Sequence, residues 1–241
     1  MKCSVVCGMG EIGRALAEVL SVNYTLFVKD KGGDFATYED YQFDSFAVCV
    51  PPVEVLHICF PYSETFVDDV LNYVDRLKPE VTVIHSTVPI GTSRACGALH
   101  SPVIGRHPHL AESIRTMTKF IGGEDASQVA DYFRRAGIEV YLTDKQESTE
   151  LSKILCTTSL GVYVEWTKDI KRQCDKYGVP FELWTIWTDE YNKGYERLNM
   201  PTVHRPNLVP IMKQIGGHCC LPNLKFIESK FVDLIEEMND V

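Results

Sequence analysis

The sequence predicts an α/β protein in which a mainly parallel sheet is followed by an all-helical domain with one long helix. Up to about residue 143, short apolar segments alternate with amphipathic segments of helical length, as they do when helices cover both faces of a parallel sheet. From residue 144 to residue 177 the chain has no proline and a single glycine, Gly161, which is typical of a long helix. We therefore expect two domains, at residues 1–143 and 144–241.

The N-terminal segment combines an apolar strand at 2–7, a glycine-rich turn and an amphipathic helix that continues to residue 20. The turn consists of Gly8, Met9, Gly10, Glu11, Ile12 and Gly13. In this context the first glycine permits a tight turn, the second lets the backbone approach a pyrophosphate, and the third allows helix and strand to pack closely. The N–H groups of a helix that begins near Glu11 would face the phosphates. The segment therefore predicts a Rossmann-type, doubly wound sheet that binds a dinucleotide.

The end of the next apolar strand, 24–28, carries the residue expected to select the dinucleotide. Asp30 lies 17 residues after Gly13, about where a carboxylate binds the ribose hydroxyls of the adenosine half. An acid at this position would repel a 2′-phosphate, which favours NAD over NADP. Lys29 and Lys31 flank the acid and weaken this preference.

The rest of the first domain follows the same alternation of apolar and amphipathic segments. Strands are predicted over 46–50, 55–60, 81–85, 119–123 and 139–142, and helices over 63–77 and 126–136.

The second domain begins with the long helix, predicted over 144–178. Asp144 and Glu147 have the spacing of a capping box at its N-terminus. At about 1.5 Å per residue this helix would be roughly 50 Å long, which suits the spine of a domain or a dimer interface. A helix at 180–198, a proline-rich loop and a final helix at 223–238 complete the domain.

Composition excludes several classes of partner. The net charge of −9 argues against a nucleic-acid-binding surface, which needs clustered basic residues. No apolar run reaches the roughly 18 residues of a membrane span, and residues 1–20 do not read as a signal peptide. The nine cysteines show no disulfide-type framework; Cys3, Cys7, Cys49 and Cys59 are expected to be buried thiols. The protein is therefore expected in the reducing cytoplasm.

Four further segments, in series, resemble motifs of the UDP-glucose/GDP-mannose dehydrogenase family, within the 6-phosphogluconate-dehydrogenase-like superfamily. They are Cys59-Phe60-Pro61, the S-T-V-P-I-G-T turn from Ser86 to Thr92, the E-x-x-K pair Glu150 and Lys153, and the G-G-x-C segment from Gly216 to Cys219. Their order and spacing agree with the family from residue 1 to about residue 224. The resemblance implies an NAD-dependent oxidation of a hydroxyl on a sugar or sugar-acid-like small molecule. It also implies a homodimer through the 144–178 helix, in a short member without the family's C-terminal nucleotide-sugar-binding domain.

Carried over position by position, the resemblance assigns roles to single residues. Cys219 would capture an aldehyde as a thiohemiacetal on the way to a thioester, and Cys220 is the alternative register for this thiol. Lys153 would stabilise negative charge on the substrate oxygen, as a fixed ammonium does. Thr87 would orient water or substrate and, with Pro61, line the cofactor site.

The chain departs from the family at three polar positions. A glutamate of the family falls on Val103, an asparagine falls on Thr157 or Thr158, and an aspartate falls near Asn223. About half of the polar machinery is therefore changed.

Alternative readings stay open. His107-Pro108 is similar to a motif of prephenate-type dehydrogenases, in which His107 would assist hydride transfer from a small carboxylate held by Arg106 or Arg115. The chain could also bind NAD without catalysis, as a regulatory subunit. Thr87 could simply cap the helix that begins near Gly91. A zinc site built from the histidines at 107 and 109 with residues 218–220 lacks a spaced cysteine pair, so no metal is expected.

Overall fold

The computed structural model describes residues 2–31, 34–39, 52–216 and 220–239. The chain divides into two units, Met1–Lys153 and Ile154–Val241. The predicted strand at 46–50 lies outside the described residues. No helix among those that are described is long and apolar enough to cross a membrane.

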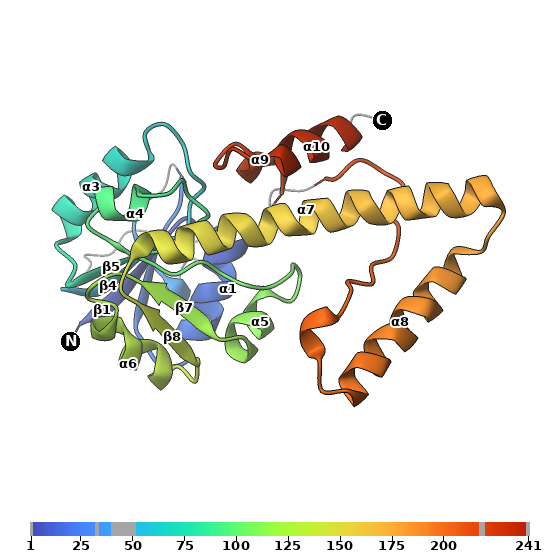
Figure 1. Cartoon of the computed structure of the whole chain (residues 1–241). Helices are drawn as coiled ribbons and strands as arrows, with labels where there is room; N and C mark the ends of the chain where they lie inside the picture. The colour runs from blue at the N-terminus through green and yellow to red at the C-terminus, as the bar shows by residue number, and fades with distance from the viewer. Residues whose placement is uncertain (1, 32–33, 40–51, 217–219, 240–241) are drawn as a thin grey trace. The chain divides into compact units, whose positions relative to one another are not determined.

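A single sheet forms the centre of the first unit (Figure 1). Its strands pair in parallel, except that β3 is antiparallel to β2 and β7 is antiparallel to β6. In spatial order the described strands are β3 (Ala36–Thr37), β2 (Leu26–Lys29), β1 (Cys3–Cys7), β4 (Val53–Ile58), β5 (Val81–Ile84), β6 (Leu99–His100), β7 (Lys119–Gly122) and β8 (Val140–Thr143). The order turns back on itself between β1 and β4, which is the switch point where doubly wound folds bind ligands. The prediction of a doubly wound, mainly parallel sheet is confirmed.

Helices cover both faces of this sheet because its strands are apolar on both sides. Side chains of α1 (Glu11–Leu20), α5 (Leu110–Thr116) and α6 (Ser127–Arg135) share one hydrophobic cluster with the strands. Side chains of α3 (Phe66–Leu77) and of the residues that follow α4 (Thr92–Ala95) share the other. Figure 1 shows α3 and α4 on the side of the sheet opposite α6.

The glycine turn between β1 and α1 is held by backbone packed on backbone. Gly8 has a φ of +93°, and a Cβ there would lie 2.5 Å from the nitrogen of Phe60. A Cβ on Gly13 would lie 1.8 Å from the carbonyl oxygen of Gly8. Side chains are therefore excluded at both positions, and α1 starts as close to the strand ends as the backbone allows.

The helical part begins with α7, which runs from Gln146 to Tyr177 as one helix of 32 residues. It starts in the first unit and continues into the second. The remaining helices of the second unit are α8 (Phe181–Arg197), a 3-10 turn (Pro201–Val203), α9 (Leu221–Leu224) and α10 (Lys230–Asn239). A small core of Cys220, Leu224, Val232 and Ile235 joins α9 and α10. The predicted long helix is confirmed.

One expectation about local structure was wrong, and some short elements were missed. The final helix predicted at 223–238 is broken after α9, because the backbone carbonyl of Ser229 accepts the N–H groups of Val232 and Asp233 and so starts α10 as a new helix. The strand β6 and the helix α5 were not predicted. Both are short, and they have no repeating apolar pattern that would reveal them.

Cysteines in the first unit behave as buried thiols. Burial raises the pKa of Cys59 to about 12 and that of Cys96 to about 11. It also raises the pKa of Cys7. Cys49, which was expected to behave alike, lies outside the described residues.

Replacing Gly13 with alanine should destabilise the first unit strongly, because a Cβ 1.8 Å from a carbonyl oxygen forces the backbone to move. We expect the free energy of unfolding to fall by about 3 kcal/mol, measured by chemical denaturation. The matched control is Gly194→Ala in the middle of α8, where no described atom lies within 4 Å of the added carbon. The control should gain up to about 1 kcal/mol; equal stabilities of the two variants would refute the close backbone contact.

Candidate functional site

The carboxyl ends of β1, β4 and β5 are joined by a short series of contacts. The N–H of Cys59 donates to the carbonyl of Cys7 at 2.7 Å, and the N–H of His85 donates to that of Ile58 at 2.8 Å. Beyond the strands, the hydroxyl of Ser86 donates to the carbonyl of Phe60 at 2.5 Å. The glycine turn, the Phe60-Pro61 strand end and the start of the 86–92 turn therefore form one connected edge.

Gly10 is the open position of this edge. Apart from the adjoining backbone, no described atom lies within 4 Å of the place where its Cβ would stand, in contrast to the crowded Gly8 and Gly13. Gly10 is also the N-cap of α1, and no side chain caps the helix there. Free space in front of uncapped helix N–H groups fits the pyrophosphate of a dinucleotide.

The other predicted cofactor residues surround this opening. Glu11 is the exposed first residue of α1, and Ile12 behind it is half-buried. Asp30 directly follows β2, next to the turn, because the N–H of Gly8 donates to the carbonyl of Lys29 at 2.8 Å. Pro61 is exposed. One contact that the sequence did not suggest is that Arg14 Nε donates to the carbonyl of Met9 at 2.8 Å, which keeps this guanidinium against the turn.

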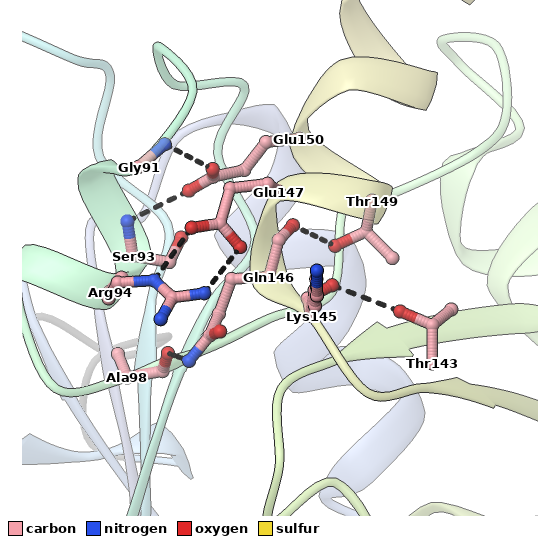
Figure 2. Close-up of polar contacts among 10 residues, drawn as sticks. All are labelled: Gly91, Ser93, Arg94, Ala98, Thr143, Lys145, Gln146, Glu147, Thr149 and Glu150. Carbon is pink, nitrogen blue, oxygen red and sulfur yellow. Dashed lines mark hydrogen bonds and ion pairs between the residues drawn. The ribbon is translucent and has the colours of Figure 1, made fainter.

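A buried carboxylate holds the 86–92 turn against α7. Glu150 is fully buried, and its two oxygens accept the backbone N–H groups of Gly91 at 2.6 Å and Ser93 at 2.8 Å (Figure 2). Gly91 and Ser93 stand at the start of α4, so Glu150 supplies the cap for which Thr87 was one candidate. Charge-assisted bonds of this kind are among the stronger hydrogen bonds in proteins.

One turn of α7 makes a second, more exposed link to the same region. Arg94 donates to both oxygens of Glu147, at 2.6 and 2.9 Å (Figure 2). The bonds from Arg94 lower the pKa of Glu147 to about 2. The capping box predicted for Glu147 and Asp144 is therefore wrong: α7 begins at Gln146, and the Glu147 side chain binds α4 instead.

Lys153 lies three residues after Glu150 on the same helix. Its ammonium donates to the carbonyl of Val103 at 2.8 Å, and the side chain is half-buried. The carbonyl that accepts from Lys153 thus belongs to Val103, the position on which the sequence comparison expected a glutamate to fall. Thr87, also half-buried, belongs to the turn that Glu150 holds.

His100 completes the connection between the turn and α7, a role that sequence patterns do not indicate. It is fully buried on β6, with Nε2 at 3.1 Å from the carbonyl of Ser86 and Nδ1 at 2.8 Å from the hydroxyl of Thr149. Burial lowers the pKa of His100 to about 4, so the ring is neutral. Because a carbonyl can only accept, the proton of the ring sits on Nε2. The hydroxyl of Thr149, next to Nδ1, also donates to the carbonyl of Gln146 at 2.9 Å.

The residues proposed for nucleophilic chemistry are not all described. Cys219 lies outside the described residues. Cys220 is buried in the second unit, and its thiol donates to the carbonyl of Thr157 at 3.6 Å. Thr157 and Thr158 are the two positions on which the family's asparagine could fall. Both hydroxyls donate to the carbonyl of Ile154 at 2.9 Å, so both bind the backbone of their own helix.

His107 is exposed in the loop before α5, and Arg106 beside it is exposed as well. Arg115 on α5 pairs with Glu18 of α1 at 3.0 Å. Within the described ranges, no three His, Cys, Asp or Glu side chains group as metal ligands.

Solved structures with this fold are known, although no family model and no curated protein matches the sequence. The chain is similar to a UDP-D-ManNAc dehydrogenase from Pyrococcus horikoshii, with a TM-score of 0.71 and 16% identity over 98% of this chain and 68% of that one. It is also similar to a UDP-glucose dehydrogenase from Pyrobaculum islandicum, with a TM-score of 0.72 and 14% identity over 100% of this chain and 68% of that one. A third similar structure is 3-hydroxyisobutyrate dehydrogenase from Mycobacterium tuberculosis, with a TM-score of 0.69, 13% identity and coverage of 98% and 92%. The chain therefore has the fold of these dehydrogenases and spans about two thirds of the length of the two sugar-nucleotide enzymes.

The two glutamates at the start of α7 provide a matched test of the site's framework. Glu150→Gln should lower the free energy of unfolding by about 1.5–3 kcal/mol, because an amide can offer only one oxygen to two buried N–H donors. Glu147→Gln should cost less than about 1 kcal/mol, because the pair with Arg94 is exposed. Denaturant titration of both variants checks this, and a larger loss for Glu147→Gln would contradict the role given to Glu150.

Proposed function

We propose that the chain is an NAD-dependent oxidoreductase that oxidises a hydroxyl of a sugar or sugar-acid-like molecule. The observation that carries this proposal is the opening at Gly10, placed at the switch point of the sheet and in front of the uncapped start of α1. The solved structures named above support the choice of reaction, because all three are dehydrogenases. In this proposal residues 1–143 bind NAD, and residues 144–241 form a helical domain for dimerisation and substrate.

The residues at the edge of the sheet have separate tasks in this proposal. Gly8, Gly10 and Gly13 let the backbone and the first N–H groups of α1 bind the pyrophosphate, and Asp30 binds the ribose hydroxyls, which favours NAD. Pro61 and Thr87 line the side of the site formed by β4 and β5. Bound NAD supplies the hydride acceptor.

Lys153 is the proposed contact to the reacting oxygen. Its ammonium is held at the carbonyl of Val103, and the helix that carries it is fixed through Glu150 to the Thr87 turn. A fixed positive charge stabilises an oxygen that becomes more negative as the hydroxyl loses its proton. Thr87 would orient the substrate or a water molecule.

Thiol chemistry is proposed at Cys219. A thiolate is a strong nucleophile and would hold an aldehyde as a thiohemiacetal. The burial of Cys220 and its bond to the carbonyl of Thr157 favour Cys219 over Cys220 for this task. The many buried thiols also support a reducing, cytoplasmic compartment.

A hydroxyacid dehydrogenase is the second candidate, and one observation favours it. The chain covers 92% of the 3-hydroxyisobutyrate dehydrogenase structure, so a domain of this size can serve a small substrate. In that case His107 would assist the transfer and Arg106 or Arg115 would bind the carboxylate. A chain that binds NAD but turns over neither class of substrate would instead be a regulatory subunit.

Replacing Gly10 with alanine separates cofactor binding from folding. The added methyl group meets no described atom within 4 Å, so the free energy of unfolding should change by less than about 1 kcal/mol. The methyl group would stand where the pyrophosphate approaches, so NAD affinity should fall at least about tenfold, or about 1.4 kcal/mol. Calorimetric titration with NAD measures this, with Gly194→Ala as the control. Unchanged NAD affinity in Gly10→Ala, or no binding by the parent protein, would overturn the proposal.

The dimer is proposed to form through α7. Large apolar side chains stand exposed along this helix, among them Leu155 at 45%, Tyr163 at 41% and Trp166 at 56%, and exposed apolar surface of this kind marks interfaces. Trp166→Glu should therefore give a monomer by analytical ultracentrifugation, while Trp166→Phe, which keeps an apolar ring, should leave the dimer intact. A monomeric parent protein would contradict this part of the proposal.

A further inference from the structure

The core of the first unit contains a row of hydrogen-bonded polar side chains, here called the hydrogen-bond chain, that the proposed reaction does not use. It runs across the α6 face of the sheet through Ser4 on β1, His57 on β4, His85 after β5 and Tyr132 on α6, and Lys119 on β7 stands at its end. All five side chains are buried. Such clusters are costly in a hydrophobic core unless every member is hydrogen-bonded, so the partners of each group decide what the chain can do.

Four close contacts link the members in a row. The hydroxyl of Tyr132 lies 2.9 Å from that of Ser4 and 3.2 Å from Nε2 of His57. Nδ1 of His57 lies 3.0 Å from Nε2 of His85. Nδ1 of His85 lies 2.8 Å from the carbonyl of Ser101. Tyr132, His57 and His85 thus each have a partner on both sides.

Lys119 contacts the last link of the row. Its Nζ lies 3.1 Å from the carbonyl of Ser101 and 3.2 Å from Nδ1 of His85. It also lies 5.2 Å from the centre of the Phe133 ring. Both the amine and the histidine therefore compete for the same carbonyl oxygen.

The contact to Ser101 defines the first of two directions in which protons can be donated along this series of hydrogen bonds. A carbonyl only accepts, so Nδ1 of His85 carries a proton and its Nε2 must accept from Nδ1–H of His57. Nε2 of His57 then accepts the hydroxyl proton of Tyr132, and the Tyr132 oxygen, which in the structure donates to Ser4 at 2.9 Å, accepts from Ser4 instead. All members are neutral in this arrangement, and it suits a neutral amine at Lys119, which can face the N–H of His85.

A proton added to Lys119 is incompatible with that direction. An ammonium has three donors and no acceptor, so it would face the N–H of His85 donor to donor. The opposite direction removes the conflict: Lys119 donates to Nδ1 of His85, Nε2–H of His85 donates to His57, Nε2–H of His57 donates to Tyr132, and Tyr132 donates to Ser4. Both histidines then change tautomer without becoming charged.

Among these buried groups, Lys119 is the one that changes its charge near neutral pH. Burial lowers its pKa to about 7, while burial lowers the pKa of His57 to about 3 and that of His85 well below its ordinary value. Of the other titratable groups that face Lys119, Cys59 stays a neutral thiol because burial raises its pKa, and His100 stays neutral because burial lowers its pKa. Burial also raises the pKa of the Tyr132 hydroxyl, so it too stays neutral.

We propose that the proton on Lys119 sets the direction of this chain, so that one change of charge in the core reverses both histidine tautomers and releases Ser101 from His85. The series of hydrogen bonds ends next to residues of the candidate site. His85 is followed by the Ser86–Thr92 turn, and Ser101 is followed two residues later by Val103, whose carbonyl accepts from Lys153. The first unit thereby contains a pH-responsive element next to its site. This inference is independent of the reaction that the site performs.

The tautomers of His57 and His85 report the switch directly. In ¹⁵N-labelled full-length protein, long-range ¹H–¹⁵N spectra from pH 5.5 to pH 9 should show Nδ1–H on both rings at high pH and Nε2–H on both at low pH. The two rings should change together, with a midpoint near the pKa of Lys119, about 7. Lys119→Met should keep Nδ1–H on both rings at every pH. Lys145→Met, which removes an exposed lysine, should behave like the parent protein.

Ser4→Ala is the second variant, in case Lys119→Met does not fold. It removes the acceptor that Tyr132 needs only when Lys119 is charged, so the midpoint should move to lower pH. Tautomers that stay fixed from pH 5.5 to pH 9 in the parent protein would overturn the proposal. So would a switch that persists in Lys119→Met, or a midpoint that does not move in Ser4→Ala.

Thermal stability gives an independent readout with a defined sign. Below about pH 7 both folded and unfolded chains carry the Lys119 proton, and the cost of burying the charge is fully present. As the pH rises from 7 towards the ordinary value of 10.5, only the unfolded chain keeps the proton, so this cost disappears and the protein gains stability. At pH 7, Lys119→Met should thus melt at least about 4 °C higher than the parent protein. Its Tm should also rise much less between pH 7 and pH 10.5 than the Tm of the parent does. An equal rise of Tm with pH in both proteins would contradict a buried titrating amine.

Discussion

The close approach of backbone to backbone at the glycine turn is the constraint on which the candidate site depends. Gly13 brings α1 against the carbonyl of Gly8, and Gly8 in turn leaves room for the backbone of Phe60. These contacts fix the start of α1 at the point where the strand order reverses. The space in front of Gly10 exists because the turn on either side of it is closed. An anion that reaches this space meets backbone N–H groups and the positive end of α1, with no side chain in between.

A second constraint connects this edge to the helical part of the chain. Glu150 binds two N–H groups at the start of α4, and His100 joins the carbonyl of Ser86 to Thr149. The 86–92 turn is therefore held from α7 as well as from β5. Lys153, one helical turn beyond Thr149, receives its position from the same two contacts and from the carbonyl of Val103. The proposed oxygen contact and the proposed cofactor edge are thus parts of one rigid framework in the first unit.

Much of the fold could be predicted from the sequence because its signals are local. The strand, glycine turn and helix at the N-terminus have a fixed spacing, and α7 has no proline and a single glycine, Gly161. The β6 strand and α5 were missed because two and seven residues are too few for a periodic pattern. The role of Glu150 could not be read because its partners lie 57 and 59 residues away in the chain. The hydrogen-bond chain from Lys119 to Ser4 could not be predicted from the sequence for the same reason. Each of its members stands alone in an apolar segment, and only the folded sheet brings them into contact.

Titration of the ¹⁵N-labelled protein with NAD shows whether the edge formed by the glycine turn and the ends of β4 and β5 binds a dinucleotide. We expect the largest changes in amide chemical shift on Gly10 to Gly13, on Phe60 and on Ser86 and Thr87. Changes that leave these amides untouched, or no change at millimolar NAD, would contradict dinucleotide binding at this edge.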